Sequence, residues 1–281
     1  MIVVQTAADL RRTLGPRQPG ARRGFVPTMG ALHDGHTTLM ARARADSAVV
    51  VASIFVNPRQ FNDPRDLAAY PRQEARDASM AEAAGVDVLF IPEVDEMYPS
   101  DIATTIEMSG AAIGFEGAHR PGHFNGVALV CLKLFNIVDP DAVYLGQKDA
   151  QQVAVLRQLV RDTNVNLDLV VMPTVRESDG VARSSRNVRL SADERARAAA
   201  IPKALIAGLE AHASGHDPVP AARAVLDAAG LVVDYVSVAA FDEPTLVVAV
   251  HAGATRLIDN VPLAHPDRAG LPGAAGGGGL P

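Results

Sequence analysis

The chain has 281 residues, 48% of them hydrophobic, and a formal net charge of −6 at pH 7. This length and apolar content are enough for one large domain, or for a large domain and a small one. The acidic balance, the lack of a basic stripe and the absence of tryptophan argue against nucleic acid or an anionic membrane surface as a partner. An anionic ligand would therefore need a local site.

Short β-branched runs alternate with alanine-rich amphipathic stretches through the first two-thirds of the chain. The runs are IVV, GFVP, AVVVASIFV, VDVLFIP, DAVYLG and LDLVVMP. Strands that alternate with helical patterns are typical of βαβ units. The fold class predicted is therefore α/β, with a parallel sheet covered by helices on both faces.

The last third of the chain has a different pattern. Ser191 and Glu194 form a capping box that predicts a long helix ending near Gly215, and a second short helix should end near Gly230. The runs LVVDYVSV, TLVVAV and TRLIDNV then predict three strands. Together these elements predict a small α+β domain.

These patterns divide the chain into three parts. We expect a first domain over residues 1–175, a smaller α+β domain over residues 176–263, and a tail over residues 264–281. The tail, AHPDRAGLPGAAGGGGLP, has too few apolar residues to offset its ordering entropy, so we predict that it is disordered.

The single cysteine, Cys131, lies in the apolar run VALVCLKLFNIV, which predicts a buried thiol and excludes an intrachain disulfide. Residues 1–15 show no basic stretch followed by an apolar one, and runs such as AVVVASIFV are shorter than the ~20 residues of a membrane span. We therefore expect a cytoplasmic protein without a membrane partner.

The stretch VPTMGALHDGHTTLM combines a strand end, a loop and the start of a helix near Gly35 or His36. The amino end of a helix attracts phosphate, and His33 and His36, three residues apart, can donate hydrogen bonds from that end. Gly35 would let a nucleotide approach the backbone. Surface histidines or a satisfied core pair would give the same pattern, while zinc is disfavoured because no third ligand has suitable spacing.

Three further segments carry polar residues where an α/β sheet binds ligands. SIFVNPRQFN supplies Asn57 and Gln60, VYLGQKDAQQ supplies Lys148 and Gln152, and RESDGVARSSRN supplies two serines and Arg186. Each has an ordinary alternative: an Asn-Pro turn, an exposed lysine at a helix start, and a linker between domains. Other nucleotide signatures, such as Gly-x-x-x-x-Gly-Lys-Ser/Thr and Gly-x-Gly-x-x-Gly after a strand, are absent.

Read together, the segments resemble the pantoate–β-alanine ligase (pantothenate synthetase) family of the His-x-Gly-His nucleotidylyltransferase superfamily. The resemblance rests on PTMGALHDGH, SIFVNPRQF, DLAAYPR, GHFNGVALVCLKLFNIVDPDAVYLGQKDAQQ and RESDGVARSSRN, in this order over about residues 1–262. It implies a Rossmann-like domain, a smaller C-terminal lid domain and a homodimer. It also implies that D-pantoate, β-alanine and ATP, with magnesium, give pantothenate, AMP and pyrophosphate through a pantoyl adenylate.

The resemblance also implies roles for individual residues. The catalytic contacts to the phosphates would come from His33, His36, Lys148, Ser184, Ser185 and Arg186. The remaining ATP site would be lined by Pro27, Thr28, Met29, Gly146, Asp149 and Val175. Pantoate would be held by Gln60 and Gln152 with Asn57 nearby, and Asp77 is a candidate contact to magnesium, which would be bound mostly through the ATP phosphates.

The sequence departs from the family at one position of the last segment. Arg183 stands where the family usually carries a methionine close to the adenine, so it could stack on the base, add charge near the phosphates or spoil the pocket. Two alternatives therefore stay open beside the ligase. One is another nucleotidylyltransferase of the superfamily, and the other is a non-catalytic ATP-binding homologue.

Overall fold

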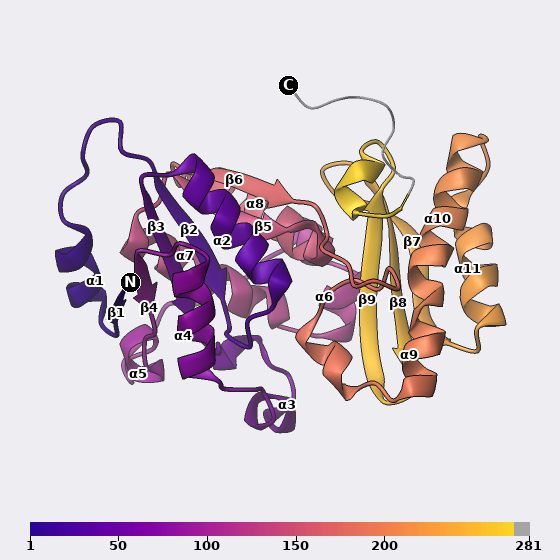
Figure 1. The fold of residues 1–281 in the computed structure, drawn as a ribbon, viewed down its shortest axis with the longest axis horizontal. Coiled ribbons are helices and arrows are strands. Elements are labelled where there is room, and N and C mark those ends of the chain that lie inside the picture. The colour runs from indigo at the N-terminus through magenta and orange to yellow at the C-terminus, as the bar shows by residue number, and fades with distance from the viewer. Residues whose placement is uncertain (273–281) are drawn as a thin grey trace. The chain divides into compact units, whose positions relative to one another are not determined.

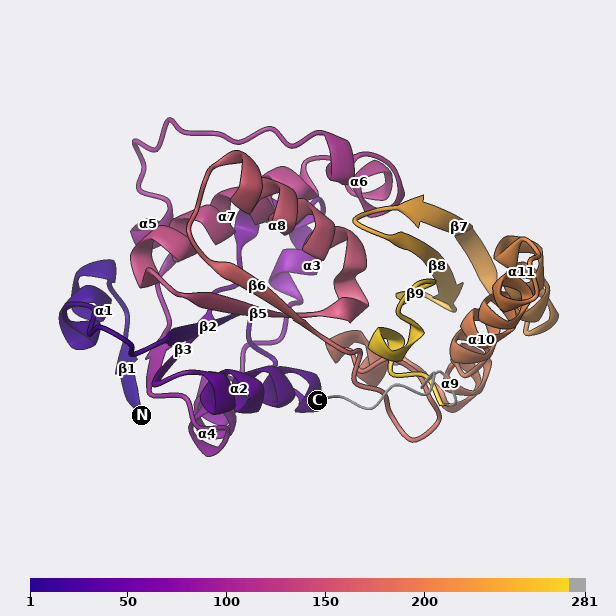
Figure 2. The same ribbon diagram turned by 90° about the horizontal axis from the view of Figure 1, so that it is seen from above.

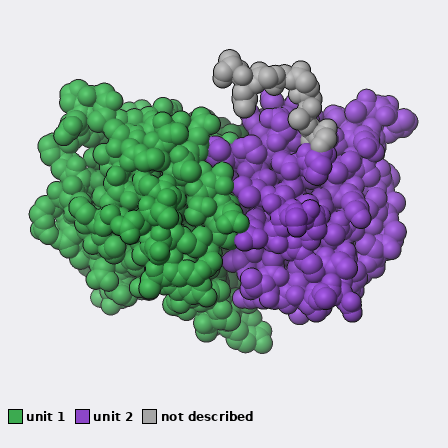
Figure 3. Space-filling model, in the orientation of Figure 1, with its two compact units in different colours: residues 1–145, 151–171 green, residues 146–150, 172–281 purple. Residues whose placement is uncertain are grey.

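The structure is a computed structural model that describes residues 1–272, and the chain divides into two compact units (Figure 3). Unit 1 comprises residues 1–145 and 151–171, and unit 2 comprises residues 146–150 and 172–281. The chain leaves unit 1 near the predicted boundary at residue 175. The short segment 146–150, however, groups with unit 2 although it is flanked by unit 1 on both sides.

Unit 1 contains a six-stranded sheet with the order β1-β4-β3-β2-β5-β6, in which neighbours from β1 to β5 are parallel. All six predicted strands are present, and the predicted α/β class is confirmed. The strands are β1 (Ile2–Val4), β2 (Arg23–Thr28), β3 (Val49–Ile54), β4 (Val88–Phe90), β5 (Ala142–Gly146) and β6 (Asp168–Met172).

Helices cover both faces of this sheet, with α2 and α4 on one face and α7 and α8 on the other (Figure 2). The central strands are therefore buried on both sides, which explains why they read as continuous apolar runs. The helices from α1 to α8 are α1 (Ala7–Leu14), α2 (Asp34–Asp46), α3 (Pro64–Ala68), α4 (Glu74–Ala83), α5 (Val94–Met97), α6 (Phe115–His119), α7 (His123–Val138) and α8 (Ala150–Asp162). Short 3-10 helices are η1 (Pro58–Gln60), η2 (Gly110–Ala112) and η3 (Gln147–Asp149).

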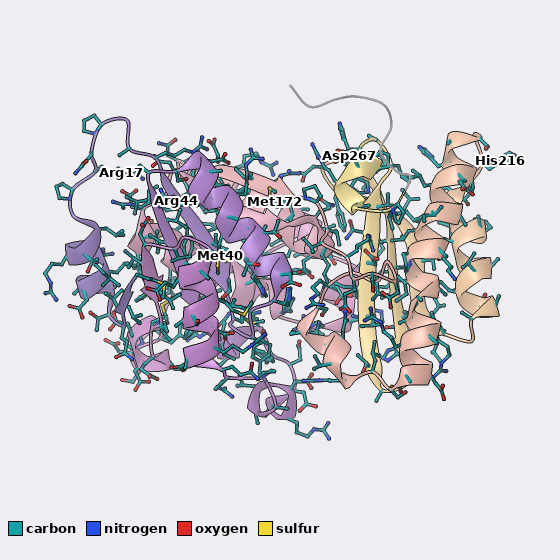
Figure 4. All side chains as sticks on the ribbon, viewed as in Figure 1. Arg17, Met40, Arg44, Met172, His216 and Asp267 are labelled. Atoms are coloured by element: carbon teal, nitrogen blue, oxygen red, sulfur yellow. The ribbon has the colours of Figure 1, made fainter. Side chains whose placement is uncertain are left out.

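The helices show how sequence pattern decides burial. On α2, Met40 is fully buried, whereas Arg44 forms an ion pair with Asp87 at 2.7 Å (Figure 4). By contrast, α7 is apolar on most of its circumference and lies in the core, where Cys131 is 6% exposed. The prediction of a buried thiol is confirmed, and burial raises the pKa of Cys131 to about 12.

Unit 2 is built on the antiparallel sheet β7-β8-β9, with α10 and α11 against one face (Figure 1). The predicted capping box is present, because Ser191 and Glu194 bond each other's backbone N–H groups. The long helix predicted after it is interrupted at Ala199. The elements are η4 (Ser185–Arg189), α9 (Ala192–Ala198), α10 (Ala200–Ala213), α11 (Pro218–Ala228), β7 (Val232–Ala240), β8 (Pro244–Ala252), β9 (Thr255–Pro262) and η5 (Pro266–Ala269).

The prediction of disorder from residue 264 is wrong for residues 264–272. These residues form η5, and Ala269 and Leu271 are buried in the core of unit 2. The segment is also fixed by its backbone, since the Arg268 carbonyl accepts the Thr174 N–H at 3.0 Å and the Ala269 carbonyl accepts Arg176 Nε at 2.7 Å. Two apolar side chains and these bonds suffice to order it. The rest of the predicted tail, 273–281, lies outside the described residues. Within residues 1–272, no helix is both long and apolar enough to cross a lipid bilayer.

Candidate active site

The loop after β2 is held in a shape that only a few residue types permit. Thr28, the last residue of β2, donates its hydroxyl to the Ser53 carbonyl at 2.7 Å and accepts the Gly30 N–H at 3.1 Å. Gly30 has φ of +80°, and a Cβ there would lie 3.0 Å from both Asp77 and Ile54 side chains. A glycine is therefore needed where the chain turns from the strand toward α2.

His33 and His36 cap the first turn of α2 with their ring nitrogens. His33 Nδ1 accepts the Gly35 N–H at 3.2 Å, and His36 Nδ1 accepts the His33 N–H at 3.3 Å. Because Nδ1 is the acceptor in both rings, the neutral form of each ring carries its proton on Nε2. The rings lie together, with centroids 4.1 Å apart. The structure thus joins the two predicted residues into a pair of Nε2–H donors at a helix amino end.

Gly35 has a structural reason beside its expected role toward a nucleotide. A Cβ at this position would lie 2.9 Å from Cε1 and 3.0 Å from Nδ1 of His33. Since real Cβ atoms are not found this close to a ring atom, a side chain at residue 35 would push the His33 ring out of its capping position. The glycine therefore permits the histidine cap itself.

Asp77 lies in the first turn of α4, is 1% exposed, and anchors the loop that leads into α2. One carboxylate oxygen accepts the Ala31 N–H at 2.7 Å, and the other accepts the Leu32 N–H at 2.8 Å. Ala31 has φ of +52°, a conformation that a residue with a side chain adopts only under such restraint. This geometry favours a positioning role for Asp77 over direct contact with magnesium.

Gln60 and Asn57 lie after β3, where the sequence placed them, and both are buried. Asn57 caps the 3-10 helix η1, its Nδ2 donates to Gln60 Oε1 at 2.9 Å, and Gln60 Nε2 donates to Met29 Sδ at 3.0 Å. The structure therefore brings Met29, Asn57 and Gln60 together. Gln152 lies half-buried on α8 of the same unit.

In unit 2, Lys148 is positioned by a residue that sequence reasoning missed. Asn260 on β9 is 3% exposed, and its Nδ2 donates to the carbonyls of Gln147 at 3.1 Å and Lys148 at 2.8 Å. Gln147 Nε2 returns a bond to Asn260 Oδ1 at 3.1 Å. Lys148 Nζ lies 3.2 Å from Asp149 Oδ1. The signal in the sequence was an asparagine within a run that reads as a strand, TRLIDNV.

The serine-rich loop of unit 2 leads into η4 and is held by hydrogen bonds and an ion pair. Ser184 caps η4 by accepting the Arg186 N–H at 3.3 Å. Glu177 accepts Asn187 Nδ2 at 2.7 Å and pairs with Arg195 at 2.9 Å. These bonds fix both ends of the segment that contains Ser184 and Ser185.

Arg183, the residue that departs from the family pattern, lies on the same loop. Its guanidinium is 3.6 Å from Glu177, and its backbone N–H donates to the Val175 carbonyl at 2.9 Å. Arg195 also pairs with Asp179. Burial opposes ionisation of Asp179, but its hydrogen bonds to Arg195 and to the backbone hold the pKa of this carboxyl below its usual value.

A pocket of unit 2 collects the basic residues of these segments. It is lined by Lys148, Ser184, Arg186 and Arg256, with the apolar side chains of Ile201 and Leu257. Three cations and a hydroxyl at one pocket suit an anion, and a guanidinium and an ammonium are the usual partners of phosphate oxygens. Asp259 also lines this pocket, and its carboxylate forms a buried ion pair with Arg176 at 2.7 Å.

The comparisons with known proteins agree along nearly the whole chain. The sequence profile described as pantoate-beta-alanine ligase matches residues 2–262. The chain is 44% identical to the pantothenate synthetase of Herpetosiphon aurantiacus over 277 residues, which cover 93% of this chain and 99% of that protein. It is 47% identical to the pantothenate synthetase of Chloroflexus aggregans over 261 residues, covering 93% and 91%.

The chain belongs to the pantoate-beta-alanine ligase family. Solved structures give the same result. The crystal structure of pantothenate synthetase from Thermus thermophilus aligns with a TM-score of 0.87 at 42% identity, covering 94% of this chain and 99% of that one. A pantoate-beta-alanine ligase from Francisella tularensis, complexed with an ATP analogue and β-alanine, aligns with a TM-score of 0.81 at 35% identity, covering 94% and 98%. The predicted family, enzyme class and ligase activity are confirmed at this level.

Proposed function

We propose that this chain condenses D-pantoate with β-alanine, using ATP, to give pantothenate, AMP and pyrophosphate through a pantoyl adenylate. One observation carries the proposal: a chain that matches the ligase family over residues 2–262 holds His33 and His36 as two Nε2–H donors at the start of α2. The relative from Francisella tularensis, complexed with an ATP analogue and β-alanine, supports two of the substrates.

In the first step, a pantoate carboxylate oxygen attacks the α-phosphorus of ATP, and pyrophosphate leaves. Negative charge grows on the phosphoryl oxygens, and donors that are already in place stabilise it without reorganisation. We assign this role to His33, His36, Lys148, Ser184, Ser185 and Arg186. Pro27, Thr28, Met29, Gly146, Asp149 and Val175 would line the rest of the nucleotide site.

In the second step, the amine of β-alanine attacks the activated carbonyl carbon, the amide bond forms, and AMP leaves with the electron pair of the broken C–O bond. The substrates supply both nucleophiles, so no side chain has to form a covalent intermediate. We assign Gln60 and Gln152 to the hydroxyl and carboxylate groups of pantoate, with Asn57 as support. Catalysis then rests on positioning, which in model reactions contributes up to about 7–11 kcal/mol.

Magnesium enters the proposal as the counter-ion of ATP. No group of three or more His, Cys, Asp or Glu side chains that could hold a metal occurs in residues 1–272. Both oxygens of Asp77 accept backbone N–H groups and the residue is 1% exposed, so we assign it to holding the loop. We therefore propose that the phosphate oxygens and water hold the ion, as is usual for Mg²⁺ with nucleotides. A homodimer and a cytoplasmic location stay predictions.

The test is release of AMP and pyrophosphate from ATP and magnesium, with D-pantoate and β-alanine added singly and together. We expect AMP release that requires both substrates. His36→Ala and Lys148→Ala should each lower the rate by several powers of ten without loss of folding, because they remove transition-state donors. His216→Ala, an exposed histidine between α10 and α11 (Figure 4), is the matched control and should not change the rate. No AMP release with any hydroxy acid, despite ATP binding, would overturn the proposal.

A further inference from the structure

A chain of hydrogen bonds in unit 1 leads from a buried tyrosine to Gln60. The Tyr98 hydroxyl donates to Asn57 Oδ1 at 2.8 Å, and Asn57 Nδ2 donates to Gln60 Oε1 at 2.9 Å. Tyr98, Asn57 and Gln60 are 7%, 1% and 8% exposed, so water competes little for these bonds. Tyr98 lies just after α5, outside every segment that pointed to function in the sequence.

The direction of this chain is set by backbone groups. Asn57 Oδ1 also accepts the Arg59 N–H at 3.2 Å, and Asn57 Nδ2 also donates to the Gly126 carbonyl at 3.1 Å. A backbone N–H can only donate and a carbonyl can only accept. If the Asn57 amide turned over, its NH₂ group would face the Arg59 N–H and its oxygen would face the Gly126 carbonyl. The orientation of Asn57 is therefore fixed.

Asn57 in turn fixes the orientation of Gln60. Because Asn57 Nδ2 is a donor, the Gln60 atom that faces it must be Oε1, and Gln60 Nε2 points toward Met29 Sδ at 3.0 Å. A thioether is a weak acceptor. A carboxylate or hydroxyl oxygen of a ligand can therefore replace it at little cost, whereas Nε2 offers nothing to a group that can only donate.

The main chain of Gln60 is restrained as well. Arg120 Nη1 lies 3.2 Å from His123 Nε2, and a guanidinium has no acceptor, so the His123 proton is on Nδ1. His123 Nδ1 then donates to the Gln60 carbonyl at 2.8 Å, and Arg120 Nη2 donates to the same oxygen at 3.2 Å. A Cβ on Gly126 would lie 2.2 Å from the Arg59 carbonyl oxygen, so α7 packs directly on this turn. With its main chain held in this way, the orientation of the Gln60 side-chain amide is decided by its bond to Asn57.

We propose that Tyr98 is a positioning residue that acts through Asn57 and makes Gln60 present an N–H donor to the oxygens of the acid substrate. This inference rests on the proposed function, because it concerns the residue assigned there to pantoate. Two features keep Tyr98 in its role. Burial raises the pKa of its hydroxyl, so the group stays protonated and donates, and the Arg59 guanidinium lies 4.6 Å from the centre of its ring.

The first test is Tyr98→Phe with a matched control. The variant leaves Asn57 Oδ1 with the longer Arg59 bond only, so we expect the KM for D-pantoate to rise about 5- to 10-fold. The KM values for ATP and β-alanine should stay within twofold. Tyr144→Phe removes another buried hydroxyl of unit 1, bonded to Asp46 at 3.2 Å, and should leave the KM for pantoate unchanged. An unchanged KM for pantoate in Tyr98→Phe, or an equal rise in both variants, would overturn the inference.

The second test exchanges the donor and acceptor atoms of the Gln60 amide. In Asn57→Asp the group that faces Gln60 can only accept, so Gln60 must turn Nε2 toward it and offer Oε1 to the ligand. We compare the Kd of D-pantoate with that of its carboxamide analogue, which carries N–H donors. The preference for pantoate should fall by about tenfold or more in this variant. If a folded Asn57→Asp variant keeps the wild-type preference for pantoate over the carboxamide, Gln60 does not present Nε2 to the ligand as proposed.

A third measurement separates this inference from the proposed function. The side-chain amide ¹⁵N–¹H signals of Asn57 and Gln60 should shift in Tyr98→Phe and not in Tyr144→Phe, without any substrate. If the wild-type protein forms no AMP with pantoate but the amide signals shift in Tyr98→Phe, the substrate assignment fails. The hydrogen-bond chain from Tyr98 through Asn57 to Gln60 is then still supported. If the wild-type protein is active but the amide signals do not shift in Tyr98→Phe, the hydrogen-bond chain is refuted and the proposed function is not.

Discussion

Asp77→Asn tests whether the loop before α2 depends on a buried carboxylate. The substitution keeps the shape of the side chain, but one of the two oxygens that accept the Ala31 and Leu32 N–H groups becomes an NH₂ group. A hydrogen bond to a charged group contributes about 1.5–3 kcal/mol, and a buried donor left unpaired costs about 1–3 kcal/mol. Because the site is 1% exposed, water cannot replace the lost acceptor. We expect the free energy of unfolding of unit 1 to fall by about 2–4 kcal/mol.

Asp77→Asn should also lower the reaction rate, because the lost hydrogen bond lets the backbone before α2 move. Leu32 precedes His33, so a shift of its backbone moves both capping histidines, and misplacement by about 1 Å can cost about 100-fold in rate. Urea unfolding gives the stability change, and AMP release at saturating substrates gives the rate. Asp66→Asn, an exposed carboxylate of α3, is the control and should alter stability by less than about 0.5 kcal/mol.

A magnesium titration distinguishes anchoring from metal binding. If Asp77 anchors the loop, excess magnesium leaves the slow rate of Asp77→Asn unchanged. Recovery of the rate at high magnesium, together with a wild-type urea midpoint, would refute the reasoning and make Asp77 a metal contact.

Three further predictions address other parts of the chain. Because burial raises the pKa of Cys131 to about 12, iodoacetamide at pH 8 should alkylate it only after urea unfolding, and rapid reaction of the folded protein would contradict its burial. The hydrogen bond from Arg17 lowers the pKa of Asp139, so the stability it contributes is present above about pH 4 and lost as the pH falls through the lowered value. Arg17→Ala should therefore lower the free energy of unfolding at pH 7 by less than about 1 kcal/mol, and this loss should shrink as the pH falls below about 4. A loss that is independent of pH would argue against this pair. Arg183→Met should keep or improve ATP affinity by calorimetry, since its guanidinium pairs with Glu177 at 3.6 Å, and a large loss would mean that Arg183 has become part of the nucleotide site.

Much of the fold follows from local sequence pattern. The strands of unit 1 are β-branched runs between amphipathic helices, and the capping box of Ser191 and Glu194 is a contact between residues three apart. Such signals need no knowledge of distant residues. The order of Ala269 and Leu271 could not be read in this way, because it depends on the core of unit 2 and on bonds with residues about 90 positions earlier.

In the candidate site too, contacts between distant residues could not be predicted from local sequence pattern. The sequence singled out His33 and Lys148, and it named Asp77 only as a candidate magnesium contact. Asn260, which bonds the Lys148 carbonyl, was missed, and both Asp77 and Asn260 act on backbone atoms of distant segments. Backbone partners leave no complementary residue type in the sequence to search for. The contact between Gly35 and the ring of His33 could not be predicted either, because that ring is placed only when the cap forms.

Backbone groups also decide which atoms the polar side chains offer to a ligand. An imidazole or an amide can either donate or accept, and the histidines of α2, Asn57 and Asn260 would each be ambiguous alone. Here the Gly35 N–H fixes the proton of His33, the Gly126 carbonyl fixes Asn57, and the carbonyl of Lys148 fixes Asn260. Since these partners belong to helix ends and turns of the fold, the donors are oriented before any ligand binds. For a reaction whose catalysis rests on positioning, such preorganisation is where the fold contributes to the rate.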